Sequence, residues 1–105
     1  MIKSGIKRSV NYNFEWDPRK AHDNLQKHGE AFDEAASVFK DHRSLSVFDL
    51  NHNESEDRWI TLGLSESGRL LVVIHTYREG SEEDVAIRII SSRKATKQET
   101  KKYGG

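Results

Sequence analysis

The sequence predicts an α+β domain in which two N-terminal helices pack on an antiparallel β-sheet and a further helix ends the chain. Three observations support this fold class. Apolar residues recur at helical spacing early in the chain, and the spacing changes to strand-like alternation after residue 43. Short polar turns separate the later strands, which favours antiparallel pairing because a parallel crossover needs roughly a dozen residues or more. The last segment is rich in lysine and has helical character.

The chain of 105 residues has room for one domain with one core. We expect residues 1–11 to form a flexible basic extension and residues 12–105 to form a single domain. Residues 12–16 alternate aromatic and polar side chains, which indicates a short strand at the start of this domain.

A first helix is predicted to begin after this strand. Asp17 is a good N-cap, and Pro18 suits the first helical position because its missing N–H would be unpaired there anyway. Gly29 can adopt the left-handed conformation that ends a helix. One face of this helix consists of Ala21, Leu25 and His28.

A second helix is predicted over residues 31–40. Its apolar side chains follow the i, i+3, i+4, i+7 rule, so this helix is expected to pack on the core. These side chains are Phe32, Ala35, Ala36 and Phe39.

Four strands are predicted to follow, at residues 45–50, 58–64, 69–77 and 85–92. In the last of these, Val85, Ile87 and Ile89 point to one face. Arg88 therefore projects from the opposite face. Arg93 follows at the point where the strand gives way to the final helix.

Composition excludes several kinds of site. The chain has no cysteine, which excludes disulfides, thiolate catalysis and cysteine-ligated zinc. Its five histidines are scattered without metal-ligand spacing, so neither a metal nor another cofactor is predicted. The sequence also lacks a signal peptide and an apolar run of the roughly 20 residues that span a bilayer. We therefore expect a cytoplasmic protein without a membrane partner.

The C-terminal segment carries most of the local charge. Between residues 88 and 102 it has two arginines and four lysines against one acid, about +5, although the formal charge of the whole chain is zero. This concentration predicts a surface that binds anions, either a nucleic-acid backbone or an acidic protein partner. Lys94, Lys97 and Lys101 are expected to contact RNA or a partner from the final helix.

Several sequence motifs resemble the BrnT toxin family in their order and spacing over residues 12–103. They are FEWDPRKA at 14–21, NLQKHG at 24–29, FDEA at 32–35, EDR at 56–58, GRLLVV at 68–73 and RIISSRKA at 88–95. The resemblance implies a type II toxin with a RelE-like fold that cleaves RNA and is neutralised by a BrnA-type antitoxin. It also implies that operator DNA is reached only through the antitoxin.

A ribonuclease that uses no metal needs a general base, a fixed cation for the attacked phosphate and a general acid. Arg58, Arg88 and Arg93 are candidates for the cation, because the planar guanidinium group can donate two hydrogen bonds to one phosphate. The alternative is that they are solvated surface cations or pair with nearby glutamates.

His75 and Glu56 are candidates for the acid and base, and Tyr77 and Arg78 for RNA contacts. Histidine titrates near neutrality, and tyrosine can donate a hydrogen bond or stack on a base. His75 can equally be a structural residue, and Glu56 can form a simple salt bridge with Arg58. Two function classes therefore stay open: an RNA-cleaving toxin, and a non-catalytic module that uses the same basic surface to bind nucleic acid or protein.

Overall fold

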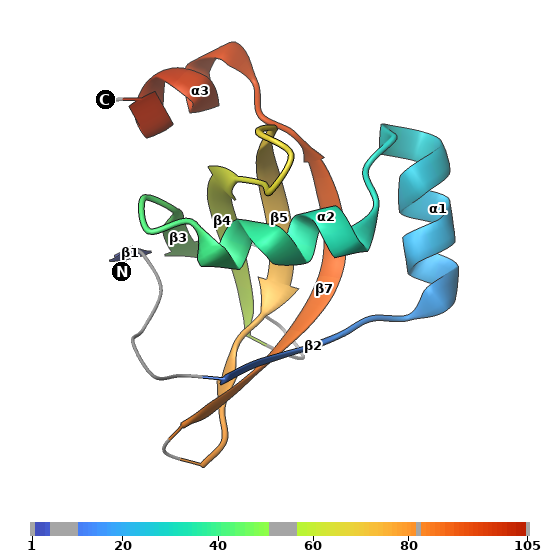
Figure 1. Ribbon diagram of the computed structural model, residues 1–105, viewed down its shortest axis with the longest axis vertical. Helices are drawn as coiled ribbons and strands as arrows, with labels where there is room; N and C mark the ends of the chain where they lie inside the picture. The colour runs from blue at the N-terminus through green and yellow to red at the C-terminus, as the bar shows by residue number, and fades with distance from the viewer. Residues whose placement is uncertain (1, 5–10, 51–56, 82, 105) are drawn as a thin grey trace.

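The computed structural model describes residues 2–4, 11–50, 57–81 and 83–104. A seven-stranded sheet runs in the order β1-β3-β4-β5-β7-β2, and β6 also pairs with β7 (Figure 1). The strands are β1 (Ile2–Ser4), β2 (Asn11–Glu15), β3 (Leu45–Phe48), β4 (Arg58–Leu64), β5 (Leu70–Thr76), β6 (Arg78–Glu79) and β7 (Asp84–Lys94). The α+β class predicted from the sequence is confirmed.

The helices are α1 (Pro18–His28), α2 (Phe32–Ser37) and α3 (Lys97–Gly104). The predicted limits of α1 are confirmed. The Asp17 side chain accepts a hydrogen bond of 2.8 Å from the backbone N–H of Arg19, and Gly29 has a φ of 71°. The second predicted helix is divided, because α2 ends at Ser37 and a 3-10 turn, η1 (Val38–Lys40), continues it.

The core lies between the α2–η1 segment and the sheet. Phe32 is 2% exposed, and Ala35 and Val38 are fully buried, so the helical spacing of the sequence does mark the packed face. They pack on one face of β5 and β7, and we call this the helix-covered face of the sheet and the opposite one the far face. The sheet contributes Leu71, Val73, Val85, Ile87 and Ile89 to this core.

The sheet is mixed, and the prediction of a purely antiparallel sheet is wrong. Strand β2 runs parallel to β7, with Phe14 opposite Ile87 and Glu15 opposite Arg88. The short turns between β3, β4 and β5 do produce antiparallel pairs, as expected. The chain between β2 and the next strands includes α1 and α2, so the turn rule does not apply to β2.

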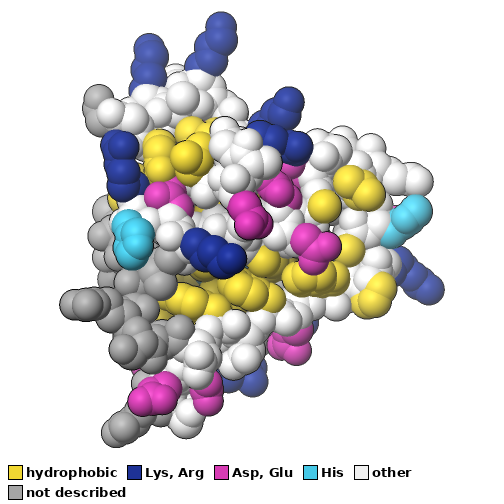
Figure 2. All heavy atoms as spheres, viewed as in Figure 1, with side chains coloured by type: hydrophobic (Ala, Val, Ile, Leu, Met, Phe, Trp, Pro, Cys, Tyr) yellow, Lys and Arg dark blue, Asp and Glu magenta, His cyan; other side chains and the backbone are white. Residues whose placement is uncertain are grey.

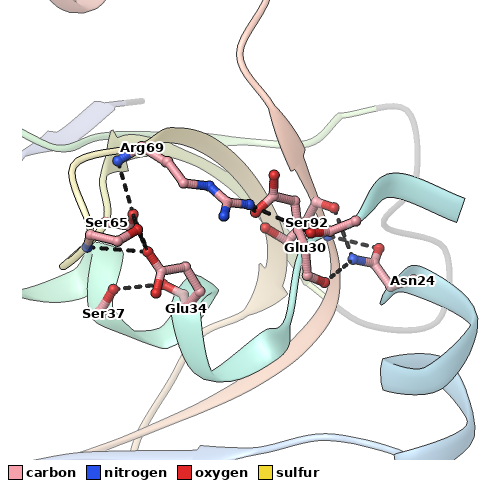
Figure 3. A network of polar contacts seen from close by, with 9 residues as sticks. Asn24, Glu30, Glu34, Ser37, Ser65, Arg69 and Ser92 are labelled. Atoms are coloured by element: carbon pink, nitrogen blue, oxygen red, sulfur yellow. Dashed lines mark hydrogen bonds and ion pairs between the residues drawn. The ribbon is translucent and has the colours of Figure 1, made fainter. Parts of the chain in front are cut away.

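Helix α1 lies beside β7 at the edge of the sheet (Figure 1). Leu25, which shares a face of the helix with Ala21 and His28, is 49% exposed, and the buried residue of α1 is Asn24. Its amide accepts from the backbone N–H of Ser92 at 3.0 Å and donates to the carbonyl oxygens of Ser92 and Glu30, both at 2.9 Å (Figure 3). Asn24 thus supplies hydrogen-bond partners for backbone groups of β7 at Ser92, which lies past the end of the ladder with β2.

A β-bulge changes the alternation within β7. Ile74 pairs with Ser91 whereas its neighbour His75 pairs with Ile89, so Ile90 is an extra residue in the ladder. Side chains five residues apart would point to opposite faces of a regular strand. Because of the bulge, Arg88 and Arg93 both point to the far face.

The N-terminal residues that are described take part in the sheet. Strand β1 pairs antiparallel with β3, and Asn11 opens β2. Residues 1 and 5–10 of the predicted flexible extension lie outside the described residues. None of the helices in the described part of the chain has the length and apolar character needed to cross a membrane.

Candidate active site on the far face of the sheet

A groove of about 540 Å³ lies where β5, β6 and β7 meet the end of β2. Its walls carry charges of both signs. The lining residues are Glu15, Asp57, Thr76, Tyr77, Arg78, Ala86 and Arg88. The composition of the groove indicates a site for a polar, charged ligand rather than for an apolar one.

The strand register brings three arginines from three different strands to this end of the far face, and two of them, Arg78 and Arg88, line the groove. Residues opposite each other on neighbouring strands share a face of the sheet. Arg78 of β6 is opposite Ala86, so it shares the face of Arg88. Arg58 of β4 is opposite Thr76, whose hydroxyl oxygen accepts a hydrogen bond of 3.2 Å from the backbone N–H of Arg88. Arg58, Arg78 and Arg88 therefore lie around one end of the far face.

Two carboxylates that the sequence did not single out belong to the same groove. Glu15, the last residue of β2, is exposed and directly opposite Arg88 in the parallel ladder. Asp57 comes immediately before β4 and is also exposed. Residue spacing gives no signal for Glu15, because its neighbour in the site is distant along the chain. Glu56, the carboxylate that the sequence did suggest, lies outside the described residues.

His75 lies away from this groove, on the helix-covered face. It is 1% exposed and its ring meets the edge of Phe39 at a centroid distance of 4.7 Å. Nδ1 donates to the carbonyl oxygen of Thr76 at 2.8 Å, so Nε2 is the acceptor for the Thr61 hydroxyl at 2.6 Å. Both ring nitrogens are engaged within the core, which argues against the catalytic role expected for His75.

Burial lowers the pKa of His75 from 6.5 to about 4. Protonation therefore favours the unfolded chain, and stability that is fully present above pH 6.5 is lost as the pH falls toward 4. We expect the free energy of unfolding to fall by up to about 1.4 kcal/mol per pH unit in this interval because of His75. Urea unfolding at pH 7, 6 and 5 measures this slope, and His75→Gln should have a shallower one. Equal slopes in the two proteins would contradict the assignment.

Arg93 points to the far face but is held at the other end of β7. Its guanidinium group donates to both carboxylate oxygens of Glu99, at 2.9 and 3.0 Å. These hydrogen bonds lower the pKa of Glu99 to about 2 and raise the pKa of Arg93. With Ile90 as an extra residue in the ladder, Arg88 and Arg93 lie roughly 13 Å apart along β7. The Arg93 guanidinium group is directed to Glu99 rather than to the groove.

Glu99 also caps helix α3. Its Oε1 accepts from the backbone N–H of Thr96 at 2.8 Å, and Thr96 Oγ1 accepts from the backbone N–H of Glu99 at 3.2 Å. This reciprocal capping box fixes the start of α3 and, through Arg93, its direction from β7. The pair agrees with the alternative that the sequence left open for Arg93, in which it binds a nearby glutamate.

We expect Arg93→Ala to cost no more than about 1 kcal/mol of stability, because the pair with Glu99 is partly exposed. The capping bonds between Thr96 and Glu99 do not depend on Arg93 and should persist. A double-mutant cycle with Glu99→Gln, followed by urea unfolding, measures the coupling between the two side chains. A coupling of zero would show that the bidentate pair contributes nothing in solution.

The predicted RNA-contacting residues separate into two groups. Tyr77 and Arg78 line the groove, although the Tyr77 ring also packs against the core and lies 6.2 Å from that of Trp59. Lys94, Lys97 and Lys101 are exposed at the far end of β7 and on α3. Figure 2 shows basic side chains projecting where Figure 1 places α3. The basic C-terminal segment is therefore not one continuous surface with the groove.

The described residues contain no group of three or more histidine, aspartate and glutamate side chains arranged to hold a metal ion. In the groove, the positive charges that face a ligand come from arginine. Guanidinium groups match the planar, bidentate geometry of phosphate oxygens. The arrangement can therefore bind a phosphodiester and stabilise negative charge that develops on it.

Comparison with known proteins agrees with this chemistry. The model of a protein family described as the ribonuclease toxin, BrnT, of type II toxin–antitoxin systems matches residues 16–99. The chain belongs to the BrnT family. Arg58, Arg78 and Arg88 all lie inside the matched region, and Glu15 directly precedes it.

A solved BrnT structure has the same type of fold. The crystal structure of the ribonuclease toxin BrnT from Brucella abortus is similar with a TM-score of 0.51 and 24% sequence identity, over 83% of this chain and all of that chain. At this identity the similarity supports the α+β architecture with its mixed sheet, not individual site residues. A search of curated proteins finds no significant match.

Proposed function

We propose that this BrnT family member is an endoribonuclease that cleaves RNA by attack of a ribose 2′-OH on the adjacent phosphate, without a metal ion. The observation that carries the proposal is the convergence of Arg58, Arg78 and Arg88 on one end of the far face. An arginine cluster of this kind suits the fixed cation that the reaction requires. The groove is open to solvent on a rigid sheet, which suits a flexible single-stranded substrate.

In this proposal each arginine has a defined part. Arg88 is held by β7 at the centre of the groove and binds the scissile phosphate. Arg58, on β4, which β5 separates from β7, adds a second cation for the charge that develops on the phosphate oxygens. Arg78, which is exposed on the short strand β6, contacts the adjacent phosphate of the RNA chain. Lys94, Lys97 and Lys101 steer the RNA backbone from a distance.

Cleavage of single-stranded RNA by the purified chain tests the proposal. The reaction should continue in excess EDTA and leave 2′,3′-cyclic phosphate and 5′-OH ends. An RNA with a single 2′-deoxy nucleotide at the cleavage position should bind but stay intact. A protein that binds RNA and cleaves neither free RNA nor mRNA on translating ribosomes would instead be a binding module.

The partners and cellular effect follow from the same proposal. We infer that RNA cleavage inhibits translation in the cytoplasm and that a BrnA-type antitoxin neutralises the protein and provides contact with operator DNA. We also infer that residues 12–105 form one RelE-like domain. Co-expression with a BrnA-type protein should restore growth and translation in cells that express this chain. Growth arrest that persists in the presence of such a protein would contradict the choice of partner.

A further inference from the structure

We propose that Glu15 is the general base that removes the proton from the ribose 2′-OH. The inference rests on the proposed ribonuclease function and identifies the residue that this reaction still lacks. His75, the usual type of side chain for this role, is enclosed in the core with both ring nitrogens hydrogen-bonded. Among the described residues that line the groove, the carboxylates can serve as the base instead.

The fold holds Glu15 at a fixed place beside the phosphate-binding arginine. Strand β2 is parallel to β7, and the last register pair of this ladder is Glu15 with Arg88. Neighbouring strands lie about 4.8 Å apart, so the two side chains start from adjacent points on the far face. A carboxylate and a guanidinium group in this arrangement can bind the 2′-OH and the adjacent phosphate of one nucleotide.

The surroundings of Glu15 keep its backbone in position. Directly before it, Phe14 is packed against Phe39 in the core at a ring distance of 5.5 Å. Directly after it, Trp16 meets the Phe32 ring edge-on at 5.9 Å. Two aromatic anchors on the helix-covered side therefore fix β2 while Glu15 itself is exposed on the other side. A functional side chain on a rigid strand of this kind is positioned more accurately than one on a loop.

Asp57 is the other carboxylate of the groove and is less suited to the role. It precedes β4, whose ladder with β5 begins at Arg58, so the sheet does not hold its backbone. Its side chain is also one methylene shorter. Asp57 is for these reasons the matched control: it places the same charge in the same groove without the support of a strand.

In the proposed step, the Glu15 carboxylate takes the proton of the 2′-OH, and the 2′-oxygen forms a bond to phosphorus. The bond between phosphorus and the 5′-oxygen breaks, and the leaving oxygen takes a proton from water in the open groove. The hydroxide that remains takes the proton held by Glu15, which restores the carboxylate. The products are a 2′,3′-cyclic phosphate and a 5′-hydroxyl, with no change in oxidation state. Arg88 stabilises the added charge on the phosphate oxygens during this exchange.

Glu15→Gln and Asp57→Asn test the inference under single-turnover conditions with saturating RNA. Each change removes one negative charge from the groove, so both variants should bind RNA at least as tightly as the wild type. We expect the cleavage rate to fall about 100-fold in Glu15→Gln and by much less in Asp57→Asn, which removes the same charge from the same groove. Glu15→Asp keeps a carboxylate and should retain part of the rate. Thermal unfolding checks that all variants are folded.

The outcomes separate this inference from the proposed function. If the wild type cleaves RNA and Glu15→Gln cleaves at the rate of Asp57→Asn, Glu15 is not the base but the ribonuclease function stands. A loss of RNA affinity in Glu15→Gln that equals the loss of rate would also overturn the inference, since Glu15 would then be a binding residue. An inert wild-type protein would overturn both.

Discussion

Arg88→Ala is expected to lower the single-turnover rate of RNA cleavage about 1,000-fold, the upper part of the range for loss of one group that stabilises charge in a transition state. The substitution removes a guanidinium group from the groove that Glu15, Thr76 and Arg78 also line. RNA affinity should fall as well, because one phosphate contact is lost. The measurement is the cleavage rate of a fluorescent single-stranded RNA at saturating protein, together with RNA binding by anisotropy.

Two further variants show whether the effect depends on geometry or on charge alone. Arg88→Lys keeps the charge and loses the planar fork, so it should recover only a small part of the rate. Lys97→Ala removes one positive charge from α3, which lies at the other end of β7, and should change RNA affinity but not the cleavage step. Equal rates for Arg88→Ala and Lys97→Ala would contradict the position of the active site.

Asn24→Ala is expected to produce the largest loss of stability. The Asn24 side chain is 6% exposed and makes three hydrogen bonds to backbone groups of Ser92 and Glu30. Alanine leaves these groups without their partner in a buried place, at about 1–3 kcal/mol for each unsatisfied group. The sum over the three groups, roughly 3–9 kcal/mol, is a large part of the stability of a domain of this size. Thermal and urea unfolding measure the loss.

The neighbouring residue provides the control for Asn24. Leu25→Ala removes more apolar volume from the same helix, but the Leu25 side chain is 49% exposed. Its substitution should change the free energy of unfolding by less than about 1 kcal/mol, as for other surface positions. If Leu25→Ala were as destabilising as Asn24→Ala, the contribution of Asn24 to the edge of β7 would be refuted.

Local patterns predicted much of the fold. The N-cap at Asp17, the left-handed Gly29 and the helical spacing of Phe32 and Ala35 all have the expected structural consequences. These features depend on residues within a few positions of one another. The alternation in β7 also predicted that Arg88 lies opposite the buried row that includes Ile87, and this is confirmed.

The candidate site was predicted only in part, because its members are distant in sequence. Alternation predicts the orientation of Arg88 but not its neighbours. The bulge at Ile90 decides that Arg93 shares the face of Arg88, and the pair with Glu99 ties Arg93 to α3. The structural role that the sequence left open for His75 agrees with the fold, in which the Phe39 ring packs against it and Thr61 binds Nε2.

The sequence by itself determined the α+β class and the family, and it predicted the face of β7 on which Arg88 lies. It did so because periodicity, capping and family motifs are properties of short segments. The tertiary structure alone decided that β2 is parallel to β7, which brings Glu15 beside Arg88. Strand pairing across the whole chain depends on how α1 and α2 pack on the sheet and bury its core. No local pattern of residues specifies that packing.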